Sequence, residues 1–268
     1  MQILPSLPLS PYIRHYLFLD SDDPGIKKLR LFSDGSAGLV FSFKNRLRSE
    51  EKKATEQNFL PGSFLYGQLE NYQNLYSGGK TALLIVVFHP HGIRQLLGIP
   101  AQELHGQIIP IEFLFGPAGK ELQDSLSESK IPQLIPILES FLLKLAAKNH
   151  SSPSFIEASV QLIVQKRGQL SSEQLSRFTG YQERQIERKF AEYIGLSPKK
   201  FCSIIRLHDF IKQLRNTLPD HHFTTMGYSS GYYDQSHQIR EFKKITGLTP
   251  SQYQNAGTTL AVNFLKVL

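Results

Sequence analysis

The stretch "HQIREFKKITGLTPSQY", residues 237–253, repeats the skeleton of an earlier stretch, "QIERKFAEYIGLSPKKF", residues 185–201. In both, a phenylalanine precedes Gly-Leu, a hydroxyl residue, a proline and then an aromatic residue. The shared positions lie 52 residues apart, as Phe190 and Phe242 show (242 − 190). Self-similarity at a fixed period marks a repeated supersecondary unit, and two copies predict a tandem pair rather than a solenoid.

Each copy has the pattern of a short helix, a tight glycine turn and a second helix, which is typical of a helix-turn-helix unit. In the first copy, Ser171 and Gln174 have the spacing of a capping box, and Gly180 marks the turn. In the second copy, the first helix is expected near 223–230 and the turn at Gly231.

The second helices of the two copies carry outward arginines. At 100° per residue, Arg184 and Arg188 each lie about 200° from the apolar Ile186. Arg240 bears the same relation to Phe242. Arginine is the commonest side chain for recognising guanine in the major groove, so this arrangement favours DNA recognition. Exposed arginines that only solvate the surface or form salt bridges are the alternative.

A long helix separates the two copies. Ser197 is expected to cap it, Pro198 suits its first turn, and its apolar stripe continues to about Arg215. The segment "GYYDQSHQIREFKKITGLTPSQY" (231–253) closely resembles the signature of the AraC/XylS family of transcriptional regulators. The resemblance extends over about 155–255 and implies an all-α domain with two helix-turn-helix units joined by the long helix.

The resemblance also implies the role of individual residues. Asp234 would cap the second unit's second helix. The side chains expected to contact bases in two adjacent major-groove segments are Arg184, Gln185, Arg188, Gln235, Ser236, His237 and Arg240. The side chains expected to contact phosphates are Lys199, Lys200, Lys243 and Lys244. Two features depart from the family pattern: Gln238 replaces a large apolar residue, and the stretch around Gly227 is poor in helix formers.

Charge supports a polyanionic partner such as double-stranded DNA. The chain has 268 residues, a net charge of +7 and a pI near 9.3. Residues 151–256 contain 14 Lys and Arg against 9 Asp and Glu, whereas residues 1–150 contain 15 against 14. The basic excess therefore lies in the repeat-bearing region, although a solvated surface would also show such an excess.

Composition narrows the class of protein further. No apolar run approaches the roughly 20 residues that span a bilayer, and the prolines near the N-terminus do not suit a signal peptide. The single cysteine, Cys202, excludes an intrachain disulfide framework and a multi-cysteine zinc site. We therefore expect a cytoplasmic protein without a membrane partner, cofactor or metal.

The first half of the chain is typical of strands. Residues 12–20 and 37–43 are aromatic and β-branched, and residues 74–88 predict a hairpin around Gly78-Gly79. A short helix is expected over 91–98. The segment 86–100 is similar to a poorly characterised N-terminal domain of some AraC/XylS regulators, whose N-terminal domains commonly sense a small molecule, dimerise, or both.

These patterns predict a multidomain protein. An N-terminal β-rich α+β domain for sensing or dimerisation (1–116) is followed by a helical connector and linker (117–150). A double helix-turn-helix domain (151–256) and a tail (257–268) complete the chain. The amphipathic helix expected over 132–148 suits either a homodimer contact or packing on its own domain.

An enzyme, or an enzyme–regulator fusion, is the alternative function for the first 150 residues. No nucleotide-binding glycine loop, nucleophile elbow or HExxH motif occurs there. A buried carboxylate pair would favour the enzyme, an apolar pocket would favour a small-molecule effector, and a filled core would favour dimerisation.

His89 and His91 could pair with His15 or His105 around a metal, but Pro90 between them favours a surface turn.

Overall fold

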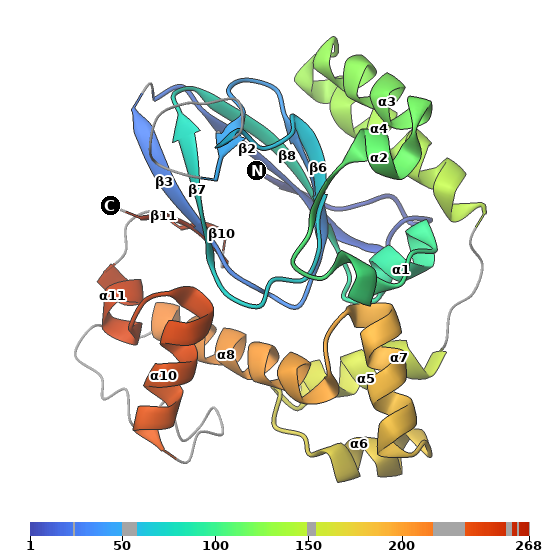
Figure 1. Ribbon diagram of the computed structural model, residues 1–268, viewed down its shortest axis with the longest axis vertical. Helices are drawn as coiled ribbons and strands as arrows, with labels where there is room; N and C mark the ends of the chain where they lie inside the picture. The colour runs from blue at the N-terminus through green and yellow to red at the C-terminus, as the bar shows by residue number, and fades with distance from the viewer. Residues whose placement is uncertain are drawn as a thin grey trace.

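The computed structural model describes residues 1–23, 25–49, 58–148, 154–216, 234–255, 259–261 and 263–267. Within these residues the N-terminal half is rich in strands and the C-terminal part is helical (Figure 1). The expected fold class, a β-rich α+β unit followed by a helical unit, is confirmed. No described helix combines the length and the apolar character needed to cross a membrane.

Six strands form the first sheet, and all neighbours in it are antiparallel. In spatial order they are β1 (Gln2–Ile3), β2 (Ile13–Ser21), β8 (Thr81–Phe88), β4 (Gly38–Ser42), β6 (Ser63–Tyr66) and β9 (Ile108–Pro110). Every residue of β8 is buried. Leu84 and Val86 enter one core, and Leu83 and Ile85 enter another, since successive side chains of a strand point to opposite faces. The continuous apolar run of β8 is thus explained by cover on both faces.

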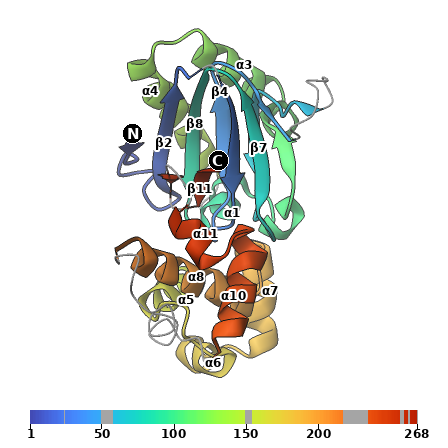
Figure 2. The same cartoon turned by 90° about the vertical axis from the view of Figure 1, so that its left-hand side faces the viewer.

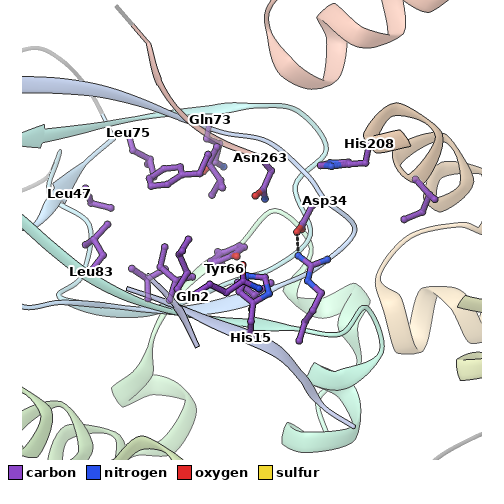
Figure 3. Close-up of a pocket in the computed structure, with 18 of the residues that line it drawn as sticks. Gln2, His15, Asp34, Leu47, Tyr66, Gln73, Leu75, Leu83, His208 and Asn263 are labelled. Atoms are coloured by element: carbon purple, nitrogen blue, oxygen red, sulfur yellow. Dashed lines mark hydrogen bonds and ion pairs between the residues drawn. The ribbon is translucent and has the colours of Figure 1, made fainter. Parts of the chain in front are cut away.

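Five strands form the second sheet, which lies against one face of the first. In spatial order they are β10 (Thr259–Ala261), β11 (Phe264–Val267), β3 (Ile26–Leu31), β7 (Gln73–Gly78) and β5 (Leu47–Arg48). The two sheets enclose a cavity of about 520 Å³ (Figure 3). The space between the sheets is therefore not completely filled by side chains.

The hairpin expected over 74–88 is wrong. β7 pairs with β3 and β5 in the second sheet, whereas β8 pairs with β2 and β4 in the first. The glycine turn carries the chain from one sheet to the other. The hydroxyls of Ser77 and Thr81 both donate to the Gly79 carbonyl oxygen, and each donor–acceptor distance is 2.9 Å. These bonds close the turn without strand pairing. Both edges of β8 are already occupied, so β7 has no place beside it.

Helices cover the other face of the first sheet. They are α1 (Gly92–Leu97), the 3₁₀ helix η2 (Ala101–Leu104), α2 (Ile111–Phe115), α3 (Pro117–Ser127) and α4 (Ile131–Ala146). Leu134, Leu138 and Leu142 of α4 are buried in the same core as Leu84 and Val86 of β8. The segment expected to be a helical connector therefore packs onto the N-terminal sheet, because its apolar stripe matches the sheet's uncovered face.

The C-terminal part consists of short helices around one long helix. They are α5 (Ser154–Gln165), α6 (Ser172–Thr179), α7 (Glu183–Ile194), α8 (Pro198–Asn216), α10 (Gln235–Thr246) and α11 (Pro250–Asn255). The expected capping box is confirmed: Ser171 Oγ accepts from the Gln174 amide at 3.1 Å, and Gln174 Oε1 accepts from the Ser171 amide at 2.9 Å. The helix expected near 223–230 and the turn expected at Gly231 fall outside the described residues.

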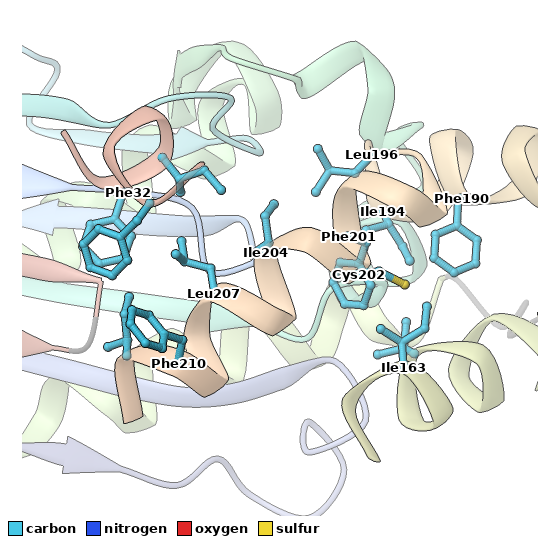
Figure 4. Close-up of a cluster of buried hydrophobic side chains, with 14 of the residues drawn as sticks. Phe32, Ile163, Phe190, Ile194, Leu196, Phe201, Cys202, Ile204, Leu207 and Phe210 are labelled. Carbon is cyan, nitrogen blue, oxygen red and sulfur yellow. The ribbon is translucent and has the colours of Figure 1, made fainter. Parts of the chain in front are cut away.

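Helix α8 runs beneath the strands, and α6 lies farther from them (Figure 2). Its inner face is apolar, and Phe201, Leu207 and Phe210 are buried along it (Figure 4). The same core includes Phe32, which follows β3, and Leu265 of β11. One continuous core therefore joins the N-terminal half to the C-terminal helices.

The C-terminal tail returns to the N-terminal half. β11 pairs with β3 in antiparallel register from Phe264–Leu31 to Val267–Lys28. Next to this ladder, the Asn263 side-chain amide donates to the Phe32 carbonyl at 3.2 Å, and the Phe32 amide donates to the Asn263 carbonyl at 3.1 Å. The tail is thus part of the second sheet, because β3 would otherwise be an open edge.

Candidate nucleic-acid interface

Helix α7 presents one polar face and one buried face. Ile186 and Phe190 are buried in the core around α8. Arg184, Gln185 and Arg188 are all exposed. The capped helix therefore holds these three predicted base-reading side chains on the outside of the molecule, as the helical spacing required.

Helix α10 repeats this arrangement. Asp234 caps it, with the Ser236 amide donating to Asp234 Oδ1 at 2.9 Å. Ser236, His237 and Arg240 are exposed, and Phe242 is fully buried. The Gln235 side chain lies outside the described residues. We call α7 and α10 the reading helices.

The departure at Gln238 has a structural counterpart. This side chain is 2% exposed, and its Nε2 has no hydrogen-bond partner among the described residues. A buried donor without a partner costs free energy. Among the described residues, the buried face of α10 thus includes a polar group without a partner, where a large apolar side chain would pack without that cost.

A basic groove joins the start of α8 to α10. It has a volume of about 530 Å³ and includes three of the predicted phosphate lysines, namely Lys199, Lys200 and Lys244. His237 and Arg240 from the base-reading set lie in the same groove. Burial, and then the nearby Lys244 charge, lower the pKa of Lys200. A bound phosphate would relieve this repulsion. Lys243 is exposed on α10 outside the groove lining.

Both reading helices end against the N-terminal half. Gly195 ends α7 and Gly247 ends α10, with φ angles of +78° and +72° that favour glycine. His105 Nδ1 donates to the Gly195 carbonyl at 2.8 Å, and the Arg30 guanidinium donates to the Gly247 carbonyl at 3.0 Å. Arg30 also lies over the Tyr72 ring, 4.3 Å from its centre. The β-rich half thus contributes to the relative position of the two reading helices.

Sequence reasoning missed these contacts. In the sequence, Gly195 and Gly247 stand out only as part of the repeat, and nothing near Arg30 or His105 marks these two side chains as their partners. A signal was nevertheless present: the terminal carbonyls of a helix need donors, and a cationic side chain suits that end. Which cations supply them depends on chain segments distant in sequence.

Two family models match separate segments of the chain. Residues 1–110 match a domain of unknown function, DUF6597, and residues 175–256 match a helix-turn-helix domain. The chain has a helix-turn-helix domain of the AraC/XylS type. This helix-turn-helix domain contains both reading helices and all the predicted DNA-contacting residues.

Individual relatives of the helix-turn-helix domain are distant. An uncharacterized HTH-type transcriptional regulator from Staphylococcus aureus is 32% identical over 85 residues, which are 32% of this chain and 11% of that protein. The C-terminal domain of AraT, a response regulator from Geobacillus stearothermophilus, shares 23% identity over 39% of this chain and 85% of that chain, with a TM-score of 0.36. ToxT from Vibrio cholerae shares 14% identity over 89% of this chain and 98% of the ToxT chain, with a TM-score of 0.46.

The histidines singled out in the sequence lie outside the helix-turn-helix domain. The His89 and His91 rings are stacked, with centres 5.9 Å apart and planes 10° apart, and His91 Nε2 lies 3.9 Å from Glu157 Oε1 of α5. Among the described residues no group of three or more His, Cys, Asp or Glu side chains could hold a metal ion. Cys202 is buried in the core around α8, and burial raises the pKa of its thiol to about 11.

Acid is expected to destabilise the fold through His15, which is half-buried, and His91, which is buried. Burial lowers the pKa of both His15 and His91 to about 4, whereas an unfolded chain titrates near 6.5. The unfolded state therefore binds protons first, so the contribution of these neutral imidazoles is complete above about pH 6.5 and is lost as the pH falls towards about 4. In His91→Gln the thermal midpoint should fall less between about pH 7.5 and pH 5 than in the parent protein. His237→Gln, which changes an exposed histidine, should leave the parent's pH dependence intact.

Proposed function

We propose that the protein is a sequence-specific DNA-binding transcriptional regulator whose reading helices enter two adjacent segments of the major groove, about 10 base pairs apart. The observation that carries this proposal is the repeated geometry of α7 and α10. Each helix is capped, buries an apolar face and exposes one or two arginines. The basic groove beside α10 suits the phosphates that flank these segments.

Base recognition is tested with Arg188→Ala and Arg240→Ala. Each should lose about 1–3 kcal/mol on a duplex selected from a random library, because one bidentate contact to a base is lost. Affinity for unselected duplex should change much less. Lys244→Ala should instead weaken binding to both duplexes. The slope of log affinity against log salt concentration should fall by about 1, the value for one lost phosphate contact.

The matched control is Lys120→Ala, which removes an exposed cation from α3 in the N-terminal half. This change should leave binding to both duplexes as it was. An arginine variant that binds selected and unselected duplex as the parent does would remove that arginine from the base-reading set.

The N-terminal half supports a sensor role in this proposal. The cavity between the sheets has an apolar wall of aliphatic and aromatic side chains and a polar part that includes Arg14, Asp34 and His208, and such a combination suits a small-molecule site. Asp34 and Asp209 are the only carboxylates in its described lining. Asp34 pairs with Arg14, and Asp209 lies 3.9 Å from Arg167, so the lining does not present the carboxylate pair expected of the alternative enzyme.

A homodimer, formed through α4, is part of the proposal. Leu134, Leu138 and Leu142 of α4 are occupied by contacts with their own sheet. Ile137 and Phe141 of the same stripe line a groove between α3 and α4 that a second copy could cover. Sedimentation of the full chain distinguishes a monomer from a dimer. As a regulator, the protein is proposed to act in the cytoplasm, where it would meet its DNA.

A further inference from the structure

The cavity between the two sheets differs at its two ends. Leu47, Leu75 and Leu83 lie at the end farther from α8 (Figure 3). The end nearer α8 holds Asp34 and His208 (Figure 3). A ligand that matches both ends needs an apolar body and a polar head, because an unpaired polar group is costly beside the leucines.

The polar end has an unmet hydrogen-bond donor. Arg14 lines the cavity and forms an ion pair with Asp34 through its terminal nitrogen. The Arg14 Nε is buried and has no hydrogen-bond partner among the described residues. The Nε has almost no accessible surface, whereas the Arg14 side chain as a whole is 38% exposed, so an acceptor in the cavity would meet the terminal nitrogens, which also hold Asp34.

The charge of the lining favours an anion at this end. The charged side chains of the described lining are Arg14, Arg167, Lys212 and Arg215 against Asp34 and Asp209. The four cations exceed the two carboxylates. Burial lowers the pKa of His15 to about 4, so this imidazole is neutral and adds nothing to the net charge of the lining. An ammonium head would add to the positive excess, whereas a carboxylate would reduce it and accept from Arg14.

The cavity wall comes from both halves of the protein. Ile205 and His208 of α8 lie in the lining, together with Phe264 of the C-terminal strand β11. Phe264 is 3% exposed, and β11 pairs with β3. A ligand in the cavity would therefore contact the sensor half, the tail and the long helix of the helix-turn-helix domain at once.

We propose that this cavity binds an apolar carboxylate, with the head held by Arg14 and the body enclosed by the two sheets and Phe264. Occupancy then changes how α8 seats on the β-rich half, and with it the affinity for DNA, because a ligand that contacts both halves favours the seating it fits best. The inference rests on the sensor role proposed above and adds the chemical class of the effector.

The test uses the full chain and three probes of equal chain length, namely decanoate, decan-1-ol and decylamine, in calorimetric titrations below their micelle concentrations. Decanoate should bind about tenfold more tightly than decan-1-ol, the size of one charge-assisted hydrogen bond, and decylamine should bind most weakly. Arg14→Gln should abolish the preference for decanoate and leave decan-1-ol binding unchanged.

Three further variants make the result specific to the cavity. Lys44→Gln, which removes a cation paired with Asp20 and Asp22, should bind all probes as the parent does. Leu83→Phe should weaken decanoate and decan-1-ol alike, because it fills the apolar end. Arg14→Gln combined with Asp34→Asn removes both charges of the pair, and it should show the same loss of preference if the single variant does not fold.

Several results would overturn the assignment. Equal binding of decanoate and decan-1-ol, or tighter binding of decylamine, would refute the anionic head, and the absence of binding by any probe would refute the apolar site. Decanoate binding that Leu83→Phe leaves intact would place the probe outside the cavity.

Measuring the affinity for DNA with and without decanoate separates this inference from the proposed function. Decanoate should change the affinity for the selected duplex by about threefold or more, within the usual range of coupling between two sites. Selective DNA binding that decanoate does not alter would refute the coupling but not the regulator. Decanoate binding by a protein that selects no DNA sequence would refute the regulator but not the carboxylate site.

Discussion

Replacing Phe242 by alanine is expected to lower the free energy of unfolding by about 3–5 kcal/mol, the usual cost of emptying a buried aromatic site. Phe242 is fully buried, and its ring meets Phe210 and Tyr253 edge-on, with ring centres 5.9 Å and 5.8 Å apart. These contacts hold α10 against α8 and α11. The variant should therefore also lose selective DNA binding, because its second reading helix is no longer held in place.

The matched control is Ile239→Ala on the same helix. Ile239 is 36% exposed, so its truncation should cost much less. Urea denaturation followed by circular dichroism measures both variants. Equal losses for Phe242→Ala and Ile239→Ala would show that α10 is not anchored through Phe242.

Replacing Gly195 by alanine should destabilise the protein by about 2–5 kcal/mol. The positive φ of +78° costs an alanine about 1–2 kcal/mol. A Cβ atom there would also lie 2.8 Å from the Ala101 carbonyl oxygen, and such overpacking costs about 1–3 kcal/mol. The second cost arises only because the end of α7 touches the N-terminal half.

Gly180 provides the control for this prediction. It has nearly the same φ, +73°, but a Cβ atom added there meets nothing within 4 Å. Gly180→Ala should therefore show the backbone cost alone in the same urea experiment. If both glycine variants lost the same stability, the contact between Gly195 and Ala101 would not hold in solution.

The helix-turn-helix units could be predicted because their signals are local. The capping pair Ser171 and Gln174, the turn at Gly180 and the outward position of Arg188 each depend on residues a few positions apart. The same applies to Asp234 as the cap of α10. Helical spacing and caps decide these features before any distant contact forms.

The N-terminal half was harder to predict from its sequence. The strands near 12–20 and 37–43 were recognised, but their partners were not. The Gly78-Gly79 turn between two strand-like runs predicts a hairpin, yet the chain changes sheets there. Strand order depends on which edges are free, and a single strand's residues do not record that.

By itself, the sequence determined that the chain has a helix-turn-helix domain, where the caps at Ser171 and Asp234 lie, and which face of each reading helix points outward. Only the tertiary structure decided that Arg30 donates to the Gly247 carbonyl across 217 residues, that His105 meets Gly195, and that the tail closes a cavity beside Arg14. The physical reason is the separation along the chain between the residues that interact. Helix periodicity and capping are interactions within one or two turns, whereas these contacts exist only after the sheets and α8 have packed together.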